Sequence, residues 1–240
     1  MAKVRLDSLV TGKGIVDSRE KARSLIMAGE VLVNGSRISK PGTMVGEDVS
    51  IHVSEKPPFV SRGGLKLAHA LDHFGINVTG KIALDVGAST GGFTHCMIKQ
   101  GARKVYALDV GYGQLDYRLR INPQVIVMEN VNAHYPFSLP ERVEIVTADV
   151  SFISLEKIIP NVTSVLEDEG ILVVLFKPQF EAGKNQVGKG GVVRDPNVHA
   201  SALGRFICWA IEYRLRIRGL IPSPILGASG NREFFLLLGM

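Results

Sequence analysis

The chain has 240 residues and a formal net charge of +5, with 45% hydrophobic and 21% charged residues. This composition is typical of a soluble globular protein with room for one medium domain and one small one. No apolar run approaches the roughly 18–20 residues that a membrane-spanning helix needs, and the first residues lack the apolar core of a signal peptide. We therefore expect a cytoplasmic protein without a membrane segment, and the positive charge mildly favours a polyanionic partner.

The first predicted unit covers residues 1–54 and mixes helices with short strands. An apolar face over Val4–Val10 predicts a short helix, and Asp17–Glu20 is typical of a helix start because glutamate follows an acidic cap three residues later. Val31–Val33 predicts a strand, which ends at the hairpin turn Asn34–Gly35. One basic face is expected from the side chains of Arg19, Lys21, Arg23, Arg37 and Lys40.

The order of motifs in this unit is specific: a helix is followed by Ser18-Arg-Glu-Lys-Ala-Arg23 and by Gly29-Glu-Val-Leu-Val-Asn-Gly35. The unit closely resembles the RNA-binding module named after ribosomal protein S4. The resemblance implies a small α+β domain whose basic helix face docks on structured RNA. Phosphate contacts of this kind give affinity and salt dependence rather than sequence choice. Without the resemblance, a charged helix face exposed only to water is the simpler interpretation.

A stretch that contains proline and glycine, 55–64, is the predicted linker, and the second unit covers 65–240. A helix over Leu65–Phe74 opens this unit, and strands then alternate with helices. We expect strands near 81–86, 104–109, 124–128, 143–149, 170–176, 215–221 and 233–238, and helices near 91–100, 154–166 and 197–213. The alternation predicts an α/β fold with a mainly parallel, seven-stranded sheet covered on both faces. Functional side chains should gather at the carboxyl ends of its strands.

The segment Lys81–Phe93 is the most informative part of the chain. An apolar strand carries Asp85 near its end, and a glycine turn follows at Gly87 before a helix that begins after Gly91 and Gly92. Such a turn lets the backbone approach a ligand closely, and the helix start offers unpaired N–H groups. The turn lacks the Gly-x-Gly of a dinucleotide site and the Lys-Ser/Thr of a phosphate loop.

An acid at this turn would repel a pyrophosphate and suits a ligand that carries positive charge and hydroxyl donors. S-adenosylmethionine has a sulfonium, an ammonium and a ribose, and Asp109 ends the next strand, where such folds bind a ribose diol. We therefore predict a Rossmann-like S-adenosylmethionine site, with an ordinary strand–turn–helix as the alternative. Its expected residues are Asp85, Gly87, Ser89, Thr90, Gly91, Gly92 and Phe93 near the methionine, Asp109 at the ribose, Asn130 near the adenine, and Asp149.

Lys177 follows Ile171–Phe176, an apolar run that we interpret as a buried central strand. A lysine at a strand end often only reaches out to solvent. Here Pro178 and a glycine-rich loop, Phe180–Gly191, come next. Such loops beside a crevice are more often lids or substrate contacts than plain connections.

Several motifs of the second unit are specific. They are Ser61-Arg-Gly-Gly-Leu-Lys-Leu67, the glycine turn, Asp149-Val-Ser-Phe-Ile-Ser154, Phe176-Lys-Pro-Gln-Phe-Glu-Ala-Gly183 and Val187-Gly-Lys-Gly-Gly-Val-Val-Arg-Asp195. Together they resemble the TlyA-type family, often labelled haemolysin A, which pairs the S4-type module with an FtsJ-like, S-adenosylmethionine-dependent ribose 2′-O-methyltransferase domain. The resemblance implies ribosomal RNA or ribosomal subunits as partner, with cytidine as the nucleotide. His134 departs from it, because many relatives have arginine there.

FtsJ-like enzymes use a Lys-Asp-Lys-Glu set, and the resemblance implies that Lys66, Asp149, Lys177 and Glu233 form it here. A ribose 2′-hydroxyl is a weak acid, so the enzyme must align oxygen, methyl carbon and sulfur and help to remove one proton. Alignment supplies up to roughly 7–11 kcal/mol in the best cases. We expect Lys177 to act as base or to orient the hydroxyl, with the two carboxylates holding the amines. Arg62 joins the expected RNA-binding side chains, and nothing in the spacing indicates a metal site.

Three other functions stay open. A membrane-lytic protein, as the haemolysin label suggests, would need a long apolar or amphipathic segment, and none is visible. A non-catalytic RNA-binding protein would show a broken tetrad or cofactor turn, and both look intact. Base-methylating enzymes commonly carry Asn/Asp-Pro-Pro-aromatic after the fourth strand, where this chain has Asp149-Val-Ser-Phe152. The residues alone do not assign the nucleotide, the ribosomal subunit or the oligomeric state.

Overall fold

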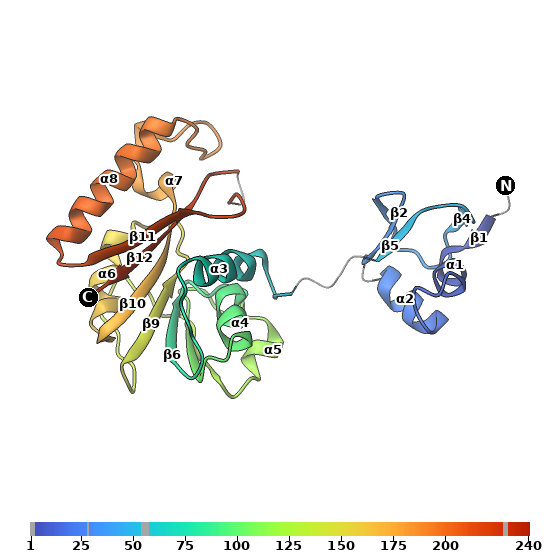
Figure 1. Ribbon diagram of the computed structural model, residues 1–240, viewed down its shortest axis with the longest axis horizontal. Helices are drawn as coiled ribbons and strands as arrows, with labels where there is room; N and C mark the ends of the chain where they lie inside the picture. The colour runs from blue at the N-terminus through green and yellow to red at the C-terminus, as the bar shows by residue number, and fades with distance from the viewer. Residues whose placement is uncertain (1–2, 28, 54–57, 228–229) are drawn as a thin grey trace. The chain divides into compact units, whose positions relative to one another are not determined.

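The computed structural model describes residues 3–27, 29–53, 58–227 and 230–240, and the chain divides into two compact units, Met1–Pro57 and Pro58–Met240 (Figure 1). Residues 54–57, which include part of the predicted linker, lie outside the described residues. Each unit has its own hydrophobic core, so the forces that hold it together can be followed within that unit.

The first unit is a small α+β domain, as predicted. Its elements are β1 (Lys3–Arg5), α1 (Leu6–Gly12), α2 (Arg19–Met27), β2 (Val31–Val33), β3 (Ser36–Arg37), β4 (Met44–Gly46) and β5 (Ile51–Val53). Strand β1 pairs with β4, and β2 lies between β3 and β5. Leu6 and Val10 of α1 share one core with Ala22 and Ile26 of α2 and with Val31 of β2. The hydrophobic faces of both helices therefore cover the three-stranded sheet.

The predicted helix over Val4–Val10 begins only at Leu6. Val4 instead lies in β1, directly opposite Val45 of β4 in an antiparallel ladder. Over so few residues an apolar pattern fits a helix and a strand equally well, and pairing with a distant segment decides between them.

The second unit is an α/β domain built around one seven-stranded sheet. Its strands are β6 (Ile82–Val86), β7 (Lys104–Leu108), β8 (Val125–Met128), β9 (Val143–Ala148), β10 (Leu166–Phe176), β11 (Arg216–Pro222) and β12 (Phe234–Gly239). Its helices are α3 (Arg62–His73), α4 (Gly92–Lys99), α5 (Tyr117–Arg120), α6 (Ile159–Thr163), α7 (Pro178–Glu181) and α8 (Pro196–Glu212), with short 3-10 turns at Leu155–Lys157 and Lys184–Gln186.

The strand order across the sheet is β11-β12-β10-β9-β6-β7-β8. All neighbours from β10 to β8 run parallel, whereas β12 is antiparallel to both β10 and β11. The prediction of a mainly parallel, seven-stranded sheet is confirmed. Because β6 lies between β7 and β9, the loops after these three strands meet at one edge of the sheet, where ligands bind in such folds.

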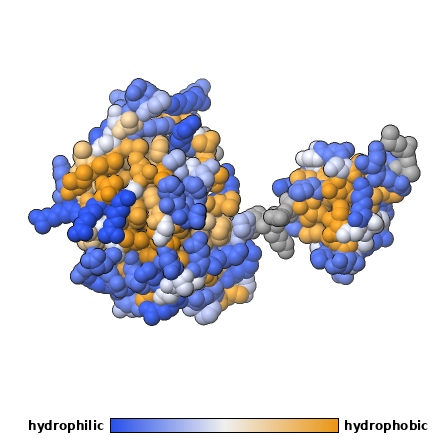
Figure 2. Space-filling model, viewed as in Figure 1, coloured by the Kyte–Doolittle hydropathy of each residue, from blue (hydrophilic) through white to orange (hydrophobic). Residues whose placement is uncertain are grey.

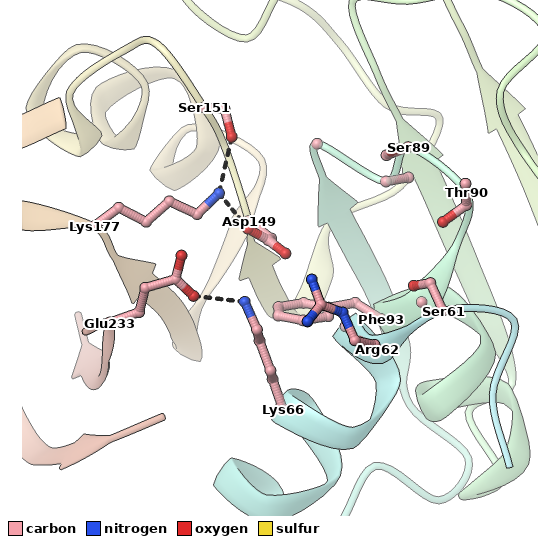
Figure 3. Close-up of a pocket in the computed structure, with 14 residues that line it drawn as sticks. Ser61, Arg62, Lys66, Ser89, Thr90, Phe93, Asp149, Ser151, Lys177 and Glu233 are labelled. Carbon is pink, nitrogen blue, oxygen red and sulfur yellow. Dashed lines mark hydrogen bonds and ion pairs between the residues drawn. The ribbon is translucent and has the colours of Figure 1, made fainter. Parts of the chain in front are cut away.

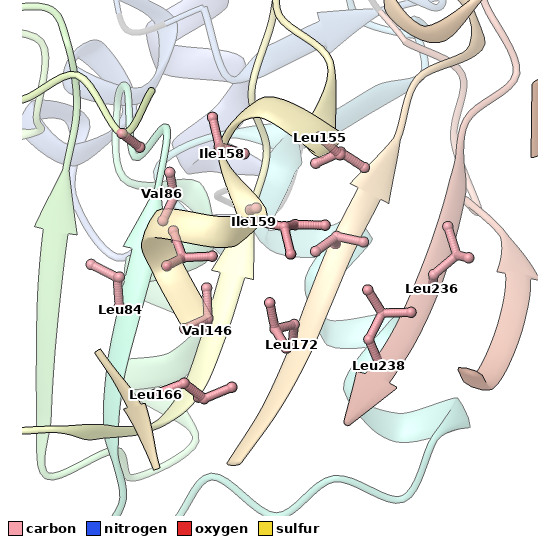
Figure 4. Packing of buried hydrophobic residues seen from close by; sticks show 14 of the residues in the cluster. Leu84, Val86, Val146, Leu155, Ile158, Ile159, Leu166, Leu172, Leu236 and Leu238 are labelled. Atoms are coloured by element: carbon pink, nitrogen blue, oxygen red, sulfur yellow. The ribbon is translucent and has the colours of Figure 1, made fainter. Parts of the chain in front are cut away.

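Alternating side chains of the strands build two cores, one on each face of the sheet. On one face Leu84, Val146 and Leu172 pack against Ile159 of α6 and Phe206 of α8, and Figure 4 shows the central part of this cluster. On the other face the neighbouring strand residues pack against α3 and α4, through residues that include Leu67, Leu71, Phe93 and Met97. Figure 1 shows the same two helical layers.

Strand β11 forms one edge of the sheet and carries exposed arginines at Arg216 and Arg218. Leu220 of the same strand and Ile211 of α8 are exposed as well, and the face in Figure 2 shows hydrophobic areas bordered by hydrophilic ones. Charged side chains on an edge strand hinder pairing with other chains. The edge is therefore protected although it is partly apolar.

Two predicted elements of the second unit differ from the structure. The helix expected over 154–166 is a 3-10 turn followed by the short α6, and β10 already begins at Leu166 and carries a bulge before Ile171. Pro160 at the start of α6 cannot donate a backbone hydrogen bond, so the turn before it cannot continue as one helix. The helix expected from Leu65 begins at Arg62, which brings three more residues into its first turn.

Candidate functional site

A pocket of about 310 Å³ lies at the carboxyl ends of β6, β9 and β10 (Figure 3). The α3 start, the glycine turn after β6 and the loops after β9 and β10 all contribute to its walls. The lining residues are Ser61, Arg62, Gly63, Lys66, Gly87, Ala88, Ser89, Thr90, Gly92, Phe93, Asp149, Ser151, Lys177 and Glu233. The four side chains expected to act in catalysis therefore surround one cavity.

Lys66 and Glu233 form one buried ion pair at the pocket wall. Lys66 Nζ lies 2.5 Å from Glu233 Oε2, and the two residues are 9% and 4% exposed. Lys66 comes from α3 and Glu233 directly precedes β12, so the pair joins segments 167 residues apart in the chain. A buried charge is tolerated only when it is paired, so each partner fixes the other.

Lys177 and Asp149 form the second ion pair. Lys177 Nζ lies 2.7 Å from Asp149 Oδ1 and donates a 2.9 Å hydrogen bond to Ser151 Oγ. Lys177 follows β10 and Asp149 follows β9, which are neighbouring parallel strands. Figure 3 shows the amines of Lys177 and Lys66 reaching the same part of the pocket from different elements, each beside its own carboxylate.

The glycine turn allows the close approach that shapes the pocket floor. Gly87 has a φ of +80°, and a Cβ there would lie 2.6 Å from the carbonyl oxygen of Asp149. A Cβ on Gly92 would lie 2.3 Å from Ser61 Oγ, because the first turns of α3 and α4 meet at this point. Any larger residue at either position would push apart the segments that line the cavity. The starts of α3 and α4 thus both border the cavity, on the side where the helix dipole is positive.

Asp85 does not line the pocket. Its carboxylate is fully buried below the turn and accepts hydrogen bonds from Thr94 N (2.8 Å), Thr94 Oγ1 (2.6 Å) and Thr147 Oγ1 (3.0 Å). All its contacts therefore tie α4 and β9 to β6. The residue expected to face the methionine part of a cofactor lies behind the glycine turn and holds it in place.

Asp109 and Asn130 also lie outside the pocket lining. Asp109 accepts hydrogen bonds from the backbone N–H groups of Ser89 and Gly111, both at 2.7 Å, and so joins the loops after β6 and β7. Asn130 is exposed after β8, with a φ of +58°. Gly91 packs against Leu115 and Leu119 rather than toward the cavity. Of the expected cofactor residues, the pocket brings together Gly87, Ser89, Thr90, Gly92, Phe93 and Asp149.

The basic residues of the first unit are exposed, but they differ in their partners. Arg19 and Arg5 both pair with the buried carboxylate of Asp7, and Lys21 pairs with Asp17 within α2. Arg23 lies with Arg19 along a groove on α2, and Arg37 and Lys40 are exposed farther along the chain. Arg62 belongs to the second unit, where it lines the pocket.

Four lining residues were missed by sequence reasoning. Ser61 and Gly63 stand at the start of α3, in a stretch predicted to be linker. Ala88 lies within the glycine turn, and Ser151 lies two residues after Asp149. The signals were present in the motifs Ser61-Arg-Gly-Gly and Asp149-Val-Ser. Their meaning depends on where helix α3 begins and on how the loop after β9 folds back.

Phe152 is the most exposed aromatic residue next to the site. It is 91% exposed, has a φ of +63°, and its ring lies 5.0 Å from that of Phe180. A left-handed conformation in a bulky residue costs about 1–3 kcal/mol and persists only where the surroundings enforce it. An apolar ring is thus held in water, one residue from the hydroxyl that binds Lys177.

The glycine-rich loop after α7 forms a small hairpin, with a bridge between Gly188 and Val192. Buried Asn231 holds it: Asn231 Nδ2 donates to Gly191 O, and Val193 N donates to Asn231 Oδ1, both at 2.9 Å. Asn231 lies two residues before Glu233, so the loop is fixed to the segment that carries part of the site.

Comparison with known proteins agrees with this arrangement. Residues 59–240 match the FtsJ-like methyltransferase family, and residues 4–51 match the S4 domain family. The chain belongs to the FtsJ-like methyltransferases. It is 42% identical over 240 residues to the 16S/23S rRNA (cytidine-2′-O)-methyltransferase TlyA of Mycobacterium tuberculosis, an alignment that covers 98% of this chain and 90% of the relative.

Two solved structures place this FtsJ-like chain among known folds. A Streptococcus thermophilus protein described as a hemolysin is 42% identical and superimposes with a TM-score of 0.75. The match covers 100% of this chain and 89% of that protein. An S-adenosylmethionine-dependent methyltransferase of Mesorhizobium loti shares the fold alone, with 13% identity, a TM-score of 0.55, and coverage of 72% of this chain and 96% of its own. The predicted Rossmann-like methyltransferase fold is confirmed, and this fold implies the use of S-adenosylmethionine.

The described part of this FtsJ-like protein contains no helix long and apolar enough to cross a membrane. Within the same residues, no cluster of histidine, cysteine or acidic side chains has the arrangement of a metal site.

Asp85 allows a test of how the turn is held. Burial raises the pKa of the Asp85 carboxyl to about 6 although Thr94 and Thr147 donate hydrogen bonds to it, whereas in the unfolded chain the pKa is about 3.9. Because the folded pKa is higher, its stabilising contribution is complete below about pH 4 and is lost as the pH rises through about 6. Asp85→Asn removes this titration.

We therefore expect the free energy of unfolding of the wild type, minus that of Asp85→Asn, to fall by about 2 kcal/mol between about pH 4 and about pH 7. Denaturant unfolding of both proteins at each pH measures the difference, and other titrating groups cancel in the subtraction. A difference that stays constant with pH would contradict the burial of this carboxylate.

Proposed function

We propose that this protein transfers a methyl group from S-adenosylmethionine to the 2′-oxygen of a ribose in ribosomal RNA, at cytidine, in the cytoplasm. The observation that carries the proposal is the arrangement of two lysine–carboxylate pairs, Lys66–Glu233 and Lys177–Asp149, around one pocket beside the glycine turn. Relatives at 42% identity that are named rRNA (cytidine-2′-O)-methyltransferases support the choice of acceptor.

The pocket residues fit S-adenosylmethionine. The turn Gly87–Phe93 approaches the cavity with its backbone, and Gly87 and Gly92 leave space that a side chain would fill. We assign the methionine carboxylate to Arg62 and the two helix starts, since all three supply positive potential. Asp85 and Asp109 do not contact the cofactor in this assignment. Their carboxylates accept hydrogen bonds from backbone N–H groups in the turn and at the start of α4, and so hold the turn in place. When bound, the sulfonium supplies an electrophilic methyl group.

Lys177 is the group that we assign to the acceptor oxygen. An ammonium has three hydrogen-bond donors, and Asp149 and Ser151 accept two of them. The third can hold the ribose 2′-oxygen in line for transfer. As the carbon–oxygen bond forms and the methyl–sulfur bond breaks, the carboxylate of Asp149, held beside Lys177, would accept the hydroxyl proton. Lys66, held by Glu233, adds a second positive charge that steadies oxygen as its proton leaves.

The acceptor RNA is held by two further features. Phe152 offers an exposed ring beside Ser151, and bases stack on such rings with about 1–3 kcal/mol per base. The S4 domain presents exposed Arg23, Arg37 and Lys40, which suit phosphate contacts. Stacking places one nucleotide at the pocket, whereas phosphate contacts give affinity for folded RNA as a whole.

Lys177→Ala is expected to lower methyl transfer at least about 100-fold, the scale of a lost proton-transfer or orienting group. Cofactor affinity should change less than about threefold, because the glycine turn is untouched. Single-turnover methylation of ribosomal RNA and calorimetric titration with S-adenosylmethionine measure the two effects. Lys81→Ala, which breaks an ion pair at the opposite end of the sheet, is the control. Full activity of Lys177→Ala would refute the assignment.

The methylated atom can be tested directly. Purified protein and S-adenosylmethionine should label ribosomal RNA at a ribose 2′-oxygen of cytidine, and cells without the gene should lack that methyl group. An RNA that carries 2′-deoxycytidine at the mapped position should bind but accept no methyl group. Methylation of a base atom, or unchanged labelling of the deoxy substrate, would exclude ribose methylation.

The role of the S4 domain predicts a specific salt dependence. Replacing Arg23 and Lys40 together with alanine should weaken RNA binding and reduce the slope of log K against log salt by about 0.7–0.9 per lost phosphate contact. The maximal rate at saturating RNA should stay near that of the wild type. Arg103→Ala, an exposed cation at the amino end of β7, serves as control. An unchanged slope in the double variant would place the RNA elsewhere.

A further inference from the structure

Glu181 is a carboxylate that the proposed reaction does not use directly. It ends α7, four residues after Lys177, and does not line the pocket. Its Oε2 accepts a 2.6 Å hydrogen bond from the Ser154 hydroxyl, and its Oε1 accepts a 2.8 Å hydrogen bond from Leu155 N. Burial raises the pKa of Glu181 above the ordinary value. Both carboxylate oxygens of Glu181 therefore accept hydrogen bonds from the neighbouring loop or the residue after it.

That neighbouring loop, Asp149–Ser154, supplies the carboxylate of the Lys177–Asp149 ion pair. It begins with the carboxylate that pairs with Lys177, continues with the Ser151 hydroxyl that accepts from Lys177, and then presents Phe152 in a left-handed conformation. Its first part is held by Lys177 itself. Its last part, after the strained residue, is held by Glu181.

The loop Asp149–Ser154 and the segment Lys177–Glu181 are thus joined by three sets of contacts. Lys177 binds Asp149 and Ser151 at the pocket, the rings of Phe152 and Phe180 lie 5.0 Å apart in the middle, and Glu181 binds the far end. Arg205 of α8 donates a 3.1 Å hydrogen bond to the Glu181 carbonyl and fixes α7 from outside. Without the carboxylate, the Phe152–Phe180 contact and the Lys177 contacts themselves would have to hold the strained backbone in place.

From this geometry we infer that Glu181 is a positioning residue for methyl transfer. By accepting hydrogen bonds from Ser154 and Leu155, it keeps Ser151 and Asp149 in contact with the Lys177 amine. The inference rests on the proposed function. Glu181 touches neither substrate nor cofactor, so its removal acts on the turnover rate and not on cofactor affinity. Its effect also requires the Ser151 hydroxyl, because that contact is what the clamp preserves.

The test replaces Glu181 with glutamine, which keeps one accepting oxygen and turns an amide N–H₂ toward the other donor. We expect kcat for ribosomal RNA methylation to fall about tenfold or more, with the Kd for S-adenosylmethionine within twofold of the wild type. Ser154→Ala, which removes the partner hydroxyl, should lower kcat in the same direction and guards against a folding defect peculiar to one variant.

The matched control is Glu144→Gln. Glu144 also bridges a side-chain donor and a backbone N–H, accepting from Lys81 Nζ at 2.8 Å and Ile82 N at 3.0 Å, but at the opposite end of the sheet. We expect its kcat to stay within twofold of the wild type. An equal loss in this control would show that Glu181→Gln acts through general destabilisation, and would overturn the inference.

A double variant separates positioning from stability. In a Ser151→Ala background, Glu181→Gln should lower kcat less than threefold, because the contact that it preserves is already gone. The same fold loss in both backgrounds, or a kcat of Glu181→Gln within twofold of the wild type, would refute the role of Glu181. Failure of the wild-type protein to methylate ribosomal RNA would instead refute the proposed function, so the two failures are distinguishable.

Discussion

The structure of the second unit depends on pairing two lysine side chains with carboxylates where little water can reach them. Lys66 and Lys177 are both about nine-tenths buried, and each has one carboxylate within 2.7 Å. Removing one partner of a buried pair costs about 3–5 kcal/mol, because the remaining charge is left uncompensated. Glu233 must therefore stay next to α3, and Asp149 next to the end of β10. These two requirements place the start of β12 and the loops after β9 and β10 around a single cavity, whichever ligand enters it.

Close backbone contact is the second constraint, and it explains why the cavity has room for a ligand beside the paired charges. The first turns of α3 and α4 meet so closely at Gly92 that a Cβ would lie 2.3 Å from Ser61 Oγ. The turn at Gly87 runs equally close to the backbone of Asp149. Small residues at these two positions draw three segments together, so that two helix starts and an ion pair border one space. The paired charges border the cavity, and the glycines leave the space beside them open.

Much of this could be predicted from the sequence, because apolar runs separated by glycine turns indicate parallel strands whose carboxyl ends meet. The seven strands and the α+β character of the first unit follow from such local patterns. Other features depend on contacts between distant residues. Val4 is drawn into a strand by Val45, and the α3 start at Arg62 is visible only once α4 lies against it. For Asp85, sequence placed the acid at the right turn but could not show that Thr94 and Thr147 surround it. The order of residues shows which acid is near a ligand, but not which way its carboxylate points.

The acids of this unit consequently divide into two groups by the donors they meet. Asp149 and Glu233 pair with lysine amines and line the cavity. Asp85, Asp109 and Glu181 meet backbone N–H groups or hydroxyls, and each joins separate segments of the chain behind the cavity wall. A carboxylate bound to fixed N–H donors holds backbone in place, since both of its oxygens are spent. A carboxylate bound to one flexible lysine keeps an oxygen and a charge available. Acidic side chains of this unit thus hold backbone segments together behind the cavity wall and pair with lysines at the cavity itself.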